Sequence, residues 1–229
     1  MKYQRFETVK RSLRSATVGL LLTATATPAL ANIELFDYSL NVDGILNPAS
    51  GVNLSLFDLN TGLGTITVSV LGAGAHYVGL FVDHEIDQSN NTNFNEFGAA
   101  NGSTAAGQTW EIDEPGFVFG DIYTNFSGSS LDGQNGVPAG SEDDVSMALG
   151  WDFVLAADEV AGILFNISLT QPTSGFYLSH TDPDADGVPT IYFSSELRTR
   201  IVGVPEPSVA GLLTIGLLAL GLSRRYARS

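Results

Sequence analysis

The chain has 229 residues, no cysteine and a formal charge of −15 at pH 7. The lack of cysteine excludes disulfides, thiolate metal sites and thiol nucleophiles. Residues 32–203 hold 23 of the 25 acidic residues but only two basic ones, Arg198 and Arg200, so this segment carries a formal charge of −21. Such a surface repels nucleic acid and anionic lipid and attracts divalent cations or cationic partners. It is equally compatible with simple solubility in a salty medium, where charges are screened over roughly 8 Å or less.

The first 31 residues have the pattern of a secretory signal peptide. An apolar core begins at Val18–Leu22, and Ala29 and Ala31 form a small-x-small cleavage site around Leu30. The core follows a basic region made of Lys2, Arg5, Lys10, Arg11 and Arg14. This order predicts export through the general secretion route, with a mature chain that starts at Asn32.

Residues 32–203 are long enough for one domain with its own core, and their apolar period is two. Polar and apolar residues alternate in Gly64–Val70, Trp151–Leu155 and Phe165–Leu169, as in half-buried strands. The other predicted strands are Ile33–Leu40, Val52–Leu59, Tyr77–Val82, Thr109–Ile112, Val118–Tyr123, Gly175–Leu178, Thr190–Phe193 and Arg198–Val202. Many short strands separated by Gly, Asn and Asp turns predict an all-β fold, an antiparallel β-sandwich of jelly-roll-like form.

Two long segments interrupt these strands. Asp87–Gly107 is rich in Asn, Gly, Ser and Ala, and Ser127–Asp143 is rich in Gly and Ser. Loops of this length in a compact domain are usually functional or mobile.

The first acidic cluster follows the predicted strand Tyr77–Val82. Strand alternation predicts that Asp83, Glu85 and Asp87 share one face. Three adjacent carboxylates repel one another unless a cation neutralises them. Calcium, which takes six to eight oxygen ligands, is the cation that this cluster predicts. Carbonyl groups could come from Asn90, Asn91 and Asn93. The alternative is a solvated acidic loop.

The second cluster is Asp182-Pro183-Asp184-Ala185-Asp186-Gly187, whose D-x-D-x-D-G spacing resembles the front half of a calcium loop. Its carboxylates, those of Asp182, Asp184 and Asp186, would converge as the chain coils. The twelfth position is Phe193 and not the glutamate of an EF-hand, so only a looser calcium turn is predicted. A third acidic run, Glu142-Asp143-Asp144, is interpreted as a solvated turn.

The sequence does not point to a specific catalytic site. His76, His84 and His180 are not arranged in a zinc motif, and we expect them to be unrelated. Nucleophile-elbow, phosphate-loop and dinucleotide patterns are missing. Some aromatic residues could stack on sugar rings if exposed, although such residues in strands are more often core; these are Trp110, Tyr123, Phe126 and Tyr177.

The last 26 residues form a tail of three parts. Val204, Pro205, Glu206 and Pro207 hold the backbone extended, because each proline fixes its own φ and restricts the residue before it. Ser208–Ser223 is uncharged and apolar, and as a helix it would span roughly 24 Å of membrane. The final arginines mark the cytoplasmic side and stop translocation; they are Arg224, Arg225 and Arg228.

This tail resembles the PEP-CTERM sorting domain of Gram-negative bacteria, in which a Pro-Glu-Pro motif precedes a short hydrophobic helix and a basic cluster. The resemblance covers residues 204–229 and implies handling by an exosortase, with cleavage near Pro205–Pro207 and release to the cell surface or the extracellular space. A plain C-terminal anchor is the alternative.

The sequence therefore divides into a signal peptide (1–31), an acidic β-sandwich (32–203) and a sorting tail (204–229). The resemblance implies a protein of cells that produce exopolysaccharide and form biofilms, with extracellular polysaccharide as its possible partner. The favoured interpretation is a non-enzymatic surface or matrix protein, without nucleic-acid binding. The alternative is a secreted polysaccharide hydrolase or lyase, with an acid/base pair among the carboxylates.

Overall fold

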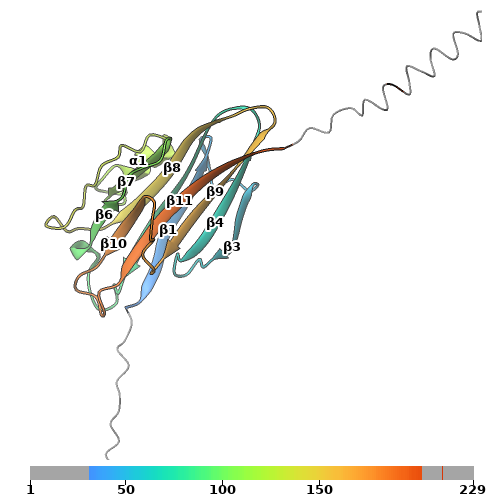
Figure 1. The fold of residues 1–229 in the computed structure, drawn as a ribbon. Helices are drawn as coiled ribbons and strands as arrows, with labels where there is room; N and C mark the ends of the chain where they lie inside the picture. The colour runs from blue at the N-terminus through green and yellow to red at the C-terminus, as the bar shows by residue number, and fades with distance from the viewer. Residues whose placement is uncertain (1–30, 203–212, 214–229) are drawn as a thin grey trace, which may run out of the picture.

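The computed structural model describes residues 31–202 and Leu213. The strands within residues 31–202 form two antiparallel sheets packed face to face (Figure 1). The first sheet contains, in spatial order, β2 (Ile45–Leu46), β1 (Ile33–Val42), β5 (Gly74–Ile86), β8 (Ser146–Leu155) and β7 (Gln108–Asp113). The second contains β3 (Val52–Phe57), β4 (Gly64–Leu71), β9 (Glu159–Ser168), β11 (Thr190–Ile201), β10 (Tyr177–Thr181) and β6 (Phe97–Asn101). The predicted all-β sandwich is confirmed at this level.

The main core lies between the two sheets, as the period of two requires. In β4 the side chains of Ile66, Val68 and Val70 are buried, and the residues between them are at least partly exposed. In β9 the same alternation buries Ile163 and Phe165. Both sheets contribute to this cluster, so residues 31–202 share one main core.

A second, smaller core covers the outer face of the first sheet. Phe81 of β5 packs there against Ile122 and Phe126 of the short helix α1 (Ile122–Ser127), which lies beside β7 at one side of the molecule (Figure 1). Because both faces of β5 are covered, every side chain from Tyr77 to Ile86 is buried, including the charged ones near its end.

Most predicted strands are present, and the exceptions have physical causes. Val118–Tyr123 is not a strand: it contains a turn and the start of α1, whose Ile122 and Phe126 are four residues apart and so face Phe81 together. The predicted strands Thr190–Phe193 and Arg198–Val202 are one strand, β11. Part of the first long loop forms a 3₁₀ turn (Asn93–Asn95) and β6, which lack an alternating pattern.

Strand register places acidic residues side by side on the outer face of the first sheet. Asp83 of β5 lies opposite Asp37 of β1 on one side and opposite Ser146 of β8 on the other. Ser146 in turn lies opposite Asp113 of β7. Directly paired residues point to the same face, so carboxylates from three strands line up in one row. Glu34 and Glu85 form a second such pair.

Candidate metal centre

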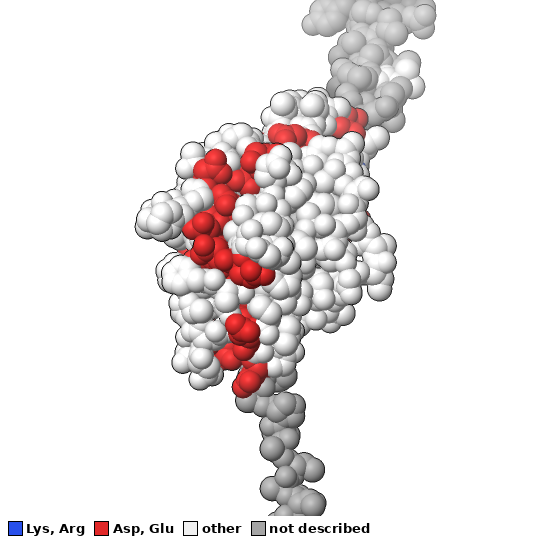
Figure 2. All heavy atoms as spheres, turned by 90° about the vertical axis from the view of Figure 1, so that its left-hand side faces the viewer, with Lys and Arg blue, Asp and Glu red and all other residues white. Residues whose placement is uncertain are grey.

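Acidic side chains gather in a band along one side of the domain (Figure 2). At the end of β5, three carboxyl groups lie together beneath the surface: those of Asp83, Glu85 and Asp144, which lies two residues before β8. Asp144 is the neighbouring charge that most raises the pKa of both other carboxyls. We call these three residues the β5 carboxylate cluster. The only basic residues between 31 and 202, Arg198 and Arg200, belong to β11 of the other sheet.

The β5 carboxylate cluster is buried and incompletely hydrogen-bonded. Asp83 is 1 % exposed and Glu85 is 5 % exposed. Within the described residues, one oxygen of each cluster member has no hydrogen-bond partner of standard geometry, and the neighbouring Ser146 hydroxyl interacts with Asp83 closely enough to lower its pKa. Buried polar atoms are normally paired, so unpaired oxygens from three carboxyl groups in one place make this cluster a candidate cation site.

Burial sets the protonation of these carboxyls. It raises the pKa of Asp83 to about 8, with the charges of Asp144 and Glu85 adding to the effect. Burial, followed by the charges of Asp144 and Glu96, raises the pKa of Glu85 to about 7. Ionising the whole cluster is therefore unfavourable without a positive charge. Carboxylate and hydroxyl oxygens are ligands for hard cations, and the flexible coordination of Ca²⁺ fits this set better than the strict octahedron of Mg²⁺.

Two hollows give access to the cluster. One, of about 200 Å³, is lined by Glu85 together with Asn32, Glu34 and Gln88. The other, of about 230 Å³, has Asp144 in its wall. Glu85 and Asp144 thus border these hollows, whereas Asp83 lines neither of them.

Asp87 does not share the face of Asp83 and Glu85, so that part of the prediction is wrong. The strand ends at Ile86, and Asp87 has a left-handed backbone conformation with φ of 56°. Its Oδ1 accepts a hydrogen bond from Asn90 Nδ2 at 2.9 Å, and its Oδ2 accepts one from the backbone N–H of Asp186 at 3.4 Å. Asp87 therefore ties the loop after β5 to the second acidic cluster.

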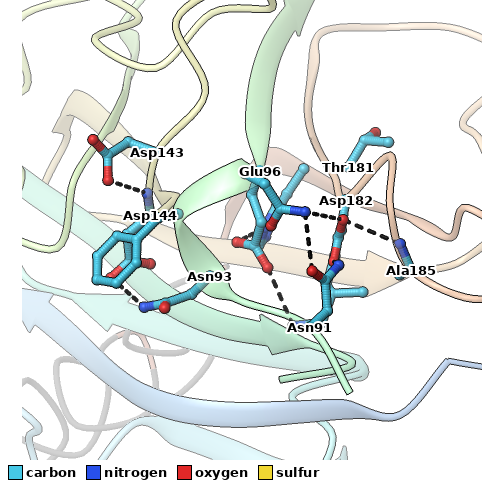
Figure 3. Close-up of polar contacts among 12 residues, drawn as sticks. Asn91, Asn93, Glu96, Asp143, Asp144, Thr181, Asp182 and Ala185 are labelled. Carbon is cyan, nitrogen blue, oxygen red and sulfur yellow. Dashed lines mark hydrogen bonds and ion pairs between the residues drawn. The ribbon is translucent and has the colours of Figure 1, made fainter. Parts of the chain in front are cut away.

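The second cluster forms a hydrogen-bonded turn around Asp182, which is fully buried. Oδ1 of Asp182 accepts bonds from the backbone N–H groups of Asp184 and Ala185 at 2.8 and 3.2 Å. Its Oδ2 accepts one from Asn91 Nδ2 at 2.8 Å, and Figure 3 shows these two side chains pointing toward each other. Both oxygens are thus engaged by nitrogen donors. The side chain of Asp186 is exposed.

Asparagine side chains connect the two acidic segments, although Asp87 and Asp182 are 95 residues apart in the sequence. Asn95 Nδ2 lies 3.1 Å from Asp182 Oδ1 and 3.1 Å from Asp184 Oδ2. Asn93 Nδ2 donates to Asp144 Oδ2 at 3.1 Å on the other side of Glu96 (Figure 3). Asn90 and Asn91 serve these turns and not the β5 carboxylate cluster. Asp144, predicted as part of a solvated turn, instead joins that cluster.

A buried glutamate–histidine pair lies beside this cluster, and the sequence did not reveal it. Glu96 Oε2 and His180 Nε2 are 2.5 Å apart, and both side chains are inaccessible to solvent. Glu96 Oε1 also accepts a bond from the backbone N–H of Ile86 at 3.3 Å. Burial raises the pKa of Glu96 to about 9 and lowers that of His180 to about 4. The pair thus shares one proton near neutral pH and carries no net charge.

The histidines are not all unrelated. His84 is buried at the same end of the sandwich as His180, and burial followed by the charge of His180 lowers the pKa of His84 to about 3. His76 is separate: its Nδ1 contacts Asp43 Oδ2 at 2.8 Å.

A further acidic group lies along the same band, where oxygens of Glu111, Asp113 and Asp121 are within 4.8 Å of one another. The oxygens of Glu111 and one oxygen of Asp113 already have donors: Glu111 accepts bonds from Asn125 Nδ2 at 2.9 Å and from the backbone N–H of Asp132 at 3.2 Å. Asp113 Oδ2 accepts the backbone N–H of Asp121 at 2.8 Å. This group therefore anchors α1 and its flanking loops to β7.

Comparison with models of protein families, with curated proteins and with solved structures gave no match. In the part of the chain that the structure describes, no helix is long and apolar enough to cross a membrane. The predicted signal peptide up to Leu30, the motif Val204–Pro207 and the arginines at 224, 225 and 228 lie outside the described residues.

Proposed function

We propose that this chain is an exported, non-enzymatic cell-surface or matrix protein whose acidic sandwich binds calcium. The calcium proposal rests on the β5 carboxylate cluster, where buried Asp83 and Glu85 keep unpaired oxygens beside Asp144. A bound cation would remove their mutual repulsion and pair those oxygens. The repeated passage of consecutive strands between the sheets supports a jelly-roll-like sandwich.

The proposed export and cell-surface or extracellular location rest on the two ends of the sequence. Residues 1–31 direct export, and Pro205-Glu206-Pro207 with the apolar helix and the arginines supports recognition by an exosortase. The tail is held in the membrane before processing, and the mature protein then reaches the cell surface or the extracellular medium. Extracellular polysaccharide is the proposed partner there.

Calcium is expected to raise the melting temperature of the protein more than magnesium does at equal ionic strength. Extracellular calcium modules bind at roughly 0.1–1 mM, so 10 mM calcium would add about 1.4–2.7 kcal/mol to the free energy of unfolding. For a domain of this size that is a shift of a few degrees to about 10 °C. Differential scanning calorimetry in each salt measures it.

Three variants locate the effect. Asp83→Asn and Glu85→Gln should shrink the calcium shift, and both should stabilise the calcium-free protein above about pH 8, where these buried carboxyls would otherwise ionise. Asp158→Asn, in the exposed turn before β9, is the matched control and should change neither quantity. Equal shifts with both metals, unchanged in Asp83→Asn, would show that only general screening is at work.

Replacing Pro205, Glu206 and Pro207 by alanine is expected to keep the protein in the inner membrane. In cells that carry the cognate exosortase, the wild-type protein should lose its apolar tail, because the extended motif is what the enzyme grips. Mass spectrometry of the surface and membrane fractions measures both. An intact tail on the wild-type protein in such cells would identify the segment as a plain anchor.

The alternative, a polysaccharide hydrolase or lyase, has one supporting observation. A carboxyl such as Asp83, whose pKa is raised to about 8, remains protonated near neutral pH, as a general acid must. Its near-complete burial, however, keeps a polymer away from it. Turnover of extracted exopolysaccharide that disappears in folded Asp83→Asn would favour the enzyme.

A further inference from the structure

Next to the β5 carboxylate cluster, the turn after β7 displays three apolar side chains to solvent. Residues 117–119, Phe-Val-Phe, are 55–82 % exposed. Their backbone is fixed: Gly116 N–H donates to Phe119 O at 2.8 Å, and Gly116 and Gly120 have φ of 85° and 74°. A Cβ at Gly120 would lie 2.3 Å from the carbonyl oxygen of Glu114. The backbone of the turn therefore holds the side chains of residues 117–119 in solvent, and it requires glycine at positions 116 and 120.

Other exposed aromatic rings extend this turn into a patch. Phe36 of β1 meets Phe117 edge-on, with ring centroids 6.5 Å apart. The register of β1 against β5 shifts between Leu35 and Asp37. Phe36 is therefore the unpaired residue of a β-bulge, and its side chain is 64 % exposed. Phe94 is exposed to the same extent. Apolar patches bordered by charges mark interaction surfaces on soluble proteins.

The patch surrounds a pocket of about 230 Å³ with an acidic side. Phe94, Phe117 and Phe119 line it together with the carboxyl-bearing residues Glu114 and Asp144. We call it the aromatic pocket. Sites for small molecules are typically roughly 300–1,000 Å³, so this pocket suits one side chain better than a whole small ligand.

We propose that the aromatic pocket binds an arginine or lysine side chain of a partner protein. A guanidinium or ammonium group is attracted by aromatic faces and by carboxylates, and its methylene stem can lie along the phenylalanine rings. The charge is complementary, because the surrounding face is acidic and the two basic residues of the domain belong to the opposite sheet. The proposal goes beyond calcium binding and does not require it.

The same acidic face argues against a lipid surface as the occupant. Exposed Phe-Val-Phe side chains could enter a bilayer, but the carboxylates around them would be repelled by anionic headgroups and would have to be desolvated beside zwitterionic ones. A basic protein segment satisfies both the rings and the carboxylates. The membrane is therefore the competing outcome of the test.

The test uses ¹⁵N-labelled residues 32–202, which contain both sheets and both core clusters, in buffer with EDTA. A capped tetrapeptide with one arginine is titrated, and the matched probe replaces arginine by citrulline, which has the same shape without the charge. We expect saturable amide shifts at Glu114, at residues 116–120 and at Asp144, with the citrulline peptide binding about fivefold or more weakly. Phe119→Ser and Glu114→Gln should each weaken arginine binding by about fivefold.

Val154→Ser is the matched control, since Val154 is an equally exposed apolar residue on β8 away from the pocket, and it should bind as the wild type does. Equal shifts with the citrulline peptide, or shifts spread over the acidic band and unchanged in Phe119→Ser, would overturn the proposal. Sedimentation with phosphatidylcholine vesicles that is lost in Phe119→Ser would overturn it in favour of a membrane-inserting turn. Because calcium is removed throughout, none of these results depends on the calcium proposal.

Discussion

Glu96→Ala is expected to lower the free energy of unfolding by about 2–6 kcal/mol, because it leaves two buried polar groups without a partner, each at a cost of about 1–3 kcal/mol. The substitution removes the partner of His180 Nε2 and the acceptor of the Ile86 backbone N–H, both of which are buried and cannot turn to water. It also leaves a void between the end of β5 and β10. Urea or guanidinium denaturation, with the slope compared between variants, measures the change.

Two further variants separate the buried pair from general effects. Glu96→Gln keeps an oxygen for Ile86 and an amide that can donate to His180, so it should lose clearly less stability than Glu96→Ala. Glu196→Ala removes a glutamate whose bond to Arg198 is exposed, so its effect should stay within about 0.5 kcal/mol. Similar losses from Glu96→Ala and Glu196→Ala would contradict the structural role of the pair.

Local patterns in the sequence sufficed for the sandwich. Alternation in Gly64–Val70 predicted β4 and its buried face, because a strand covered on one side repeats every second residue. The same rule failed for Val118–Tyr123. There Val118 and Phe119 face solvent in a glycine-bounded turn, whereas Ile122 is buried on α1, so the apolar residues of this segment do not share one buried strand face.

The acidic site was only partly predictable, because its members come from distant segments. Asp83 and Glu85 could be identified as a pair, since two residues in one strand share a face by local geometry. Asp144 joins them through the register of β5 and β8, which the sequence does not specify. Glu96 finds His180 across 84 residues, through the pairing of β6 with β10. A DxDxDG spacing likewise could not show that Asp182 would bond to nitrogen donors.

Loss of stability between pH 6.5 and pH 9 is expected for the protein in EDTA. The folded-state pKa of Glu96 is raised to about 9, well above the ordinary value of 4.5, so the folded protein keeps a proton that the unfolded chain has lost. The stability from this proton is fully present below the unfolded pKa and is lost as the pH rises through the folded one. Asp83, with a pKa raised to about 8, acts in the same direction.

The buried histidines confine this effect to the alkaline side. Their pKa values are lowered, to about 4 for His180 and about 3 for His84, so they oppose the glutamate only below about pH 6.5, where the unfolded chain gains histidine protons. Above that pH the slope reaches about 1.4 kcal/mol per pH unit for each retained proton. Denaturation curves at pH 6.5, 7.5 and 8.5 should therefore show falling midpoints, with a shallower fall in Glu96→Gln. A midpoint that stays constant or rises over this range would mean that these carboxyls ionise freely in the folded protein.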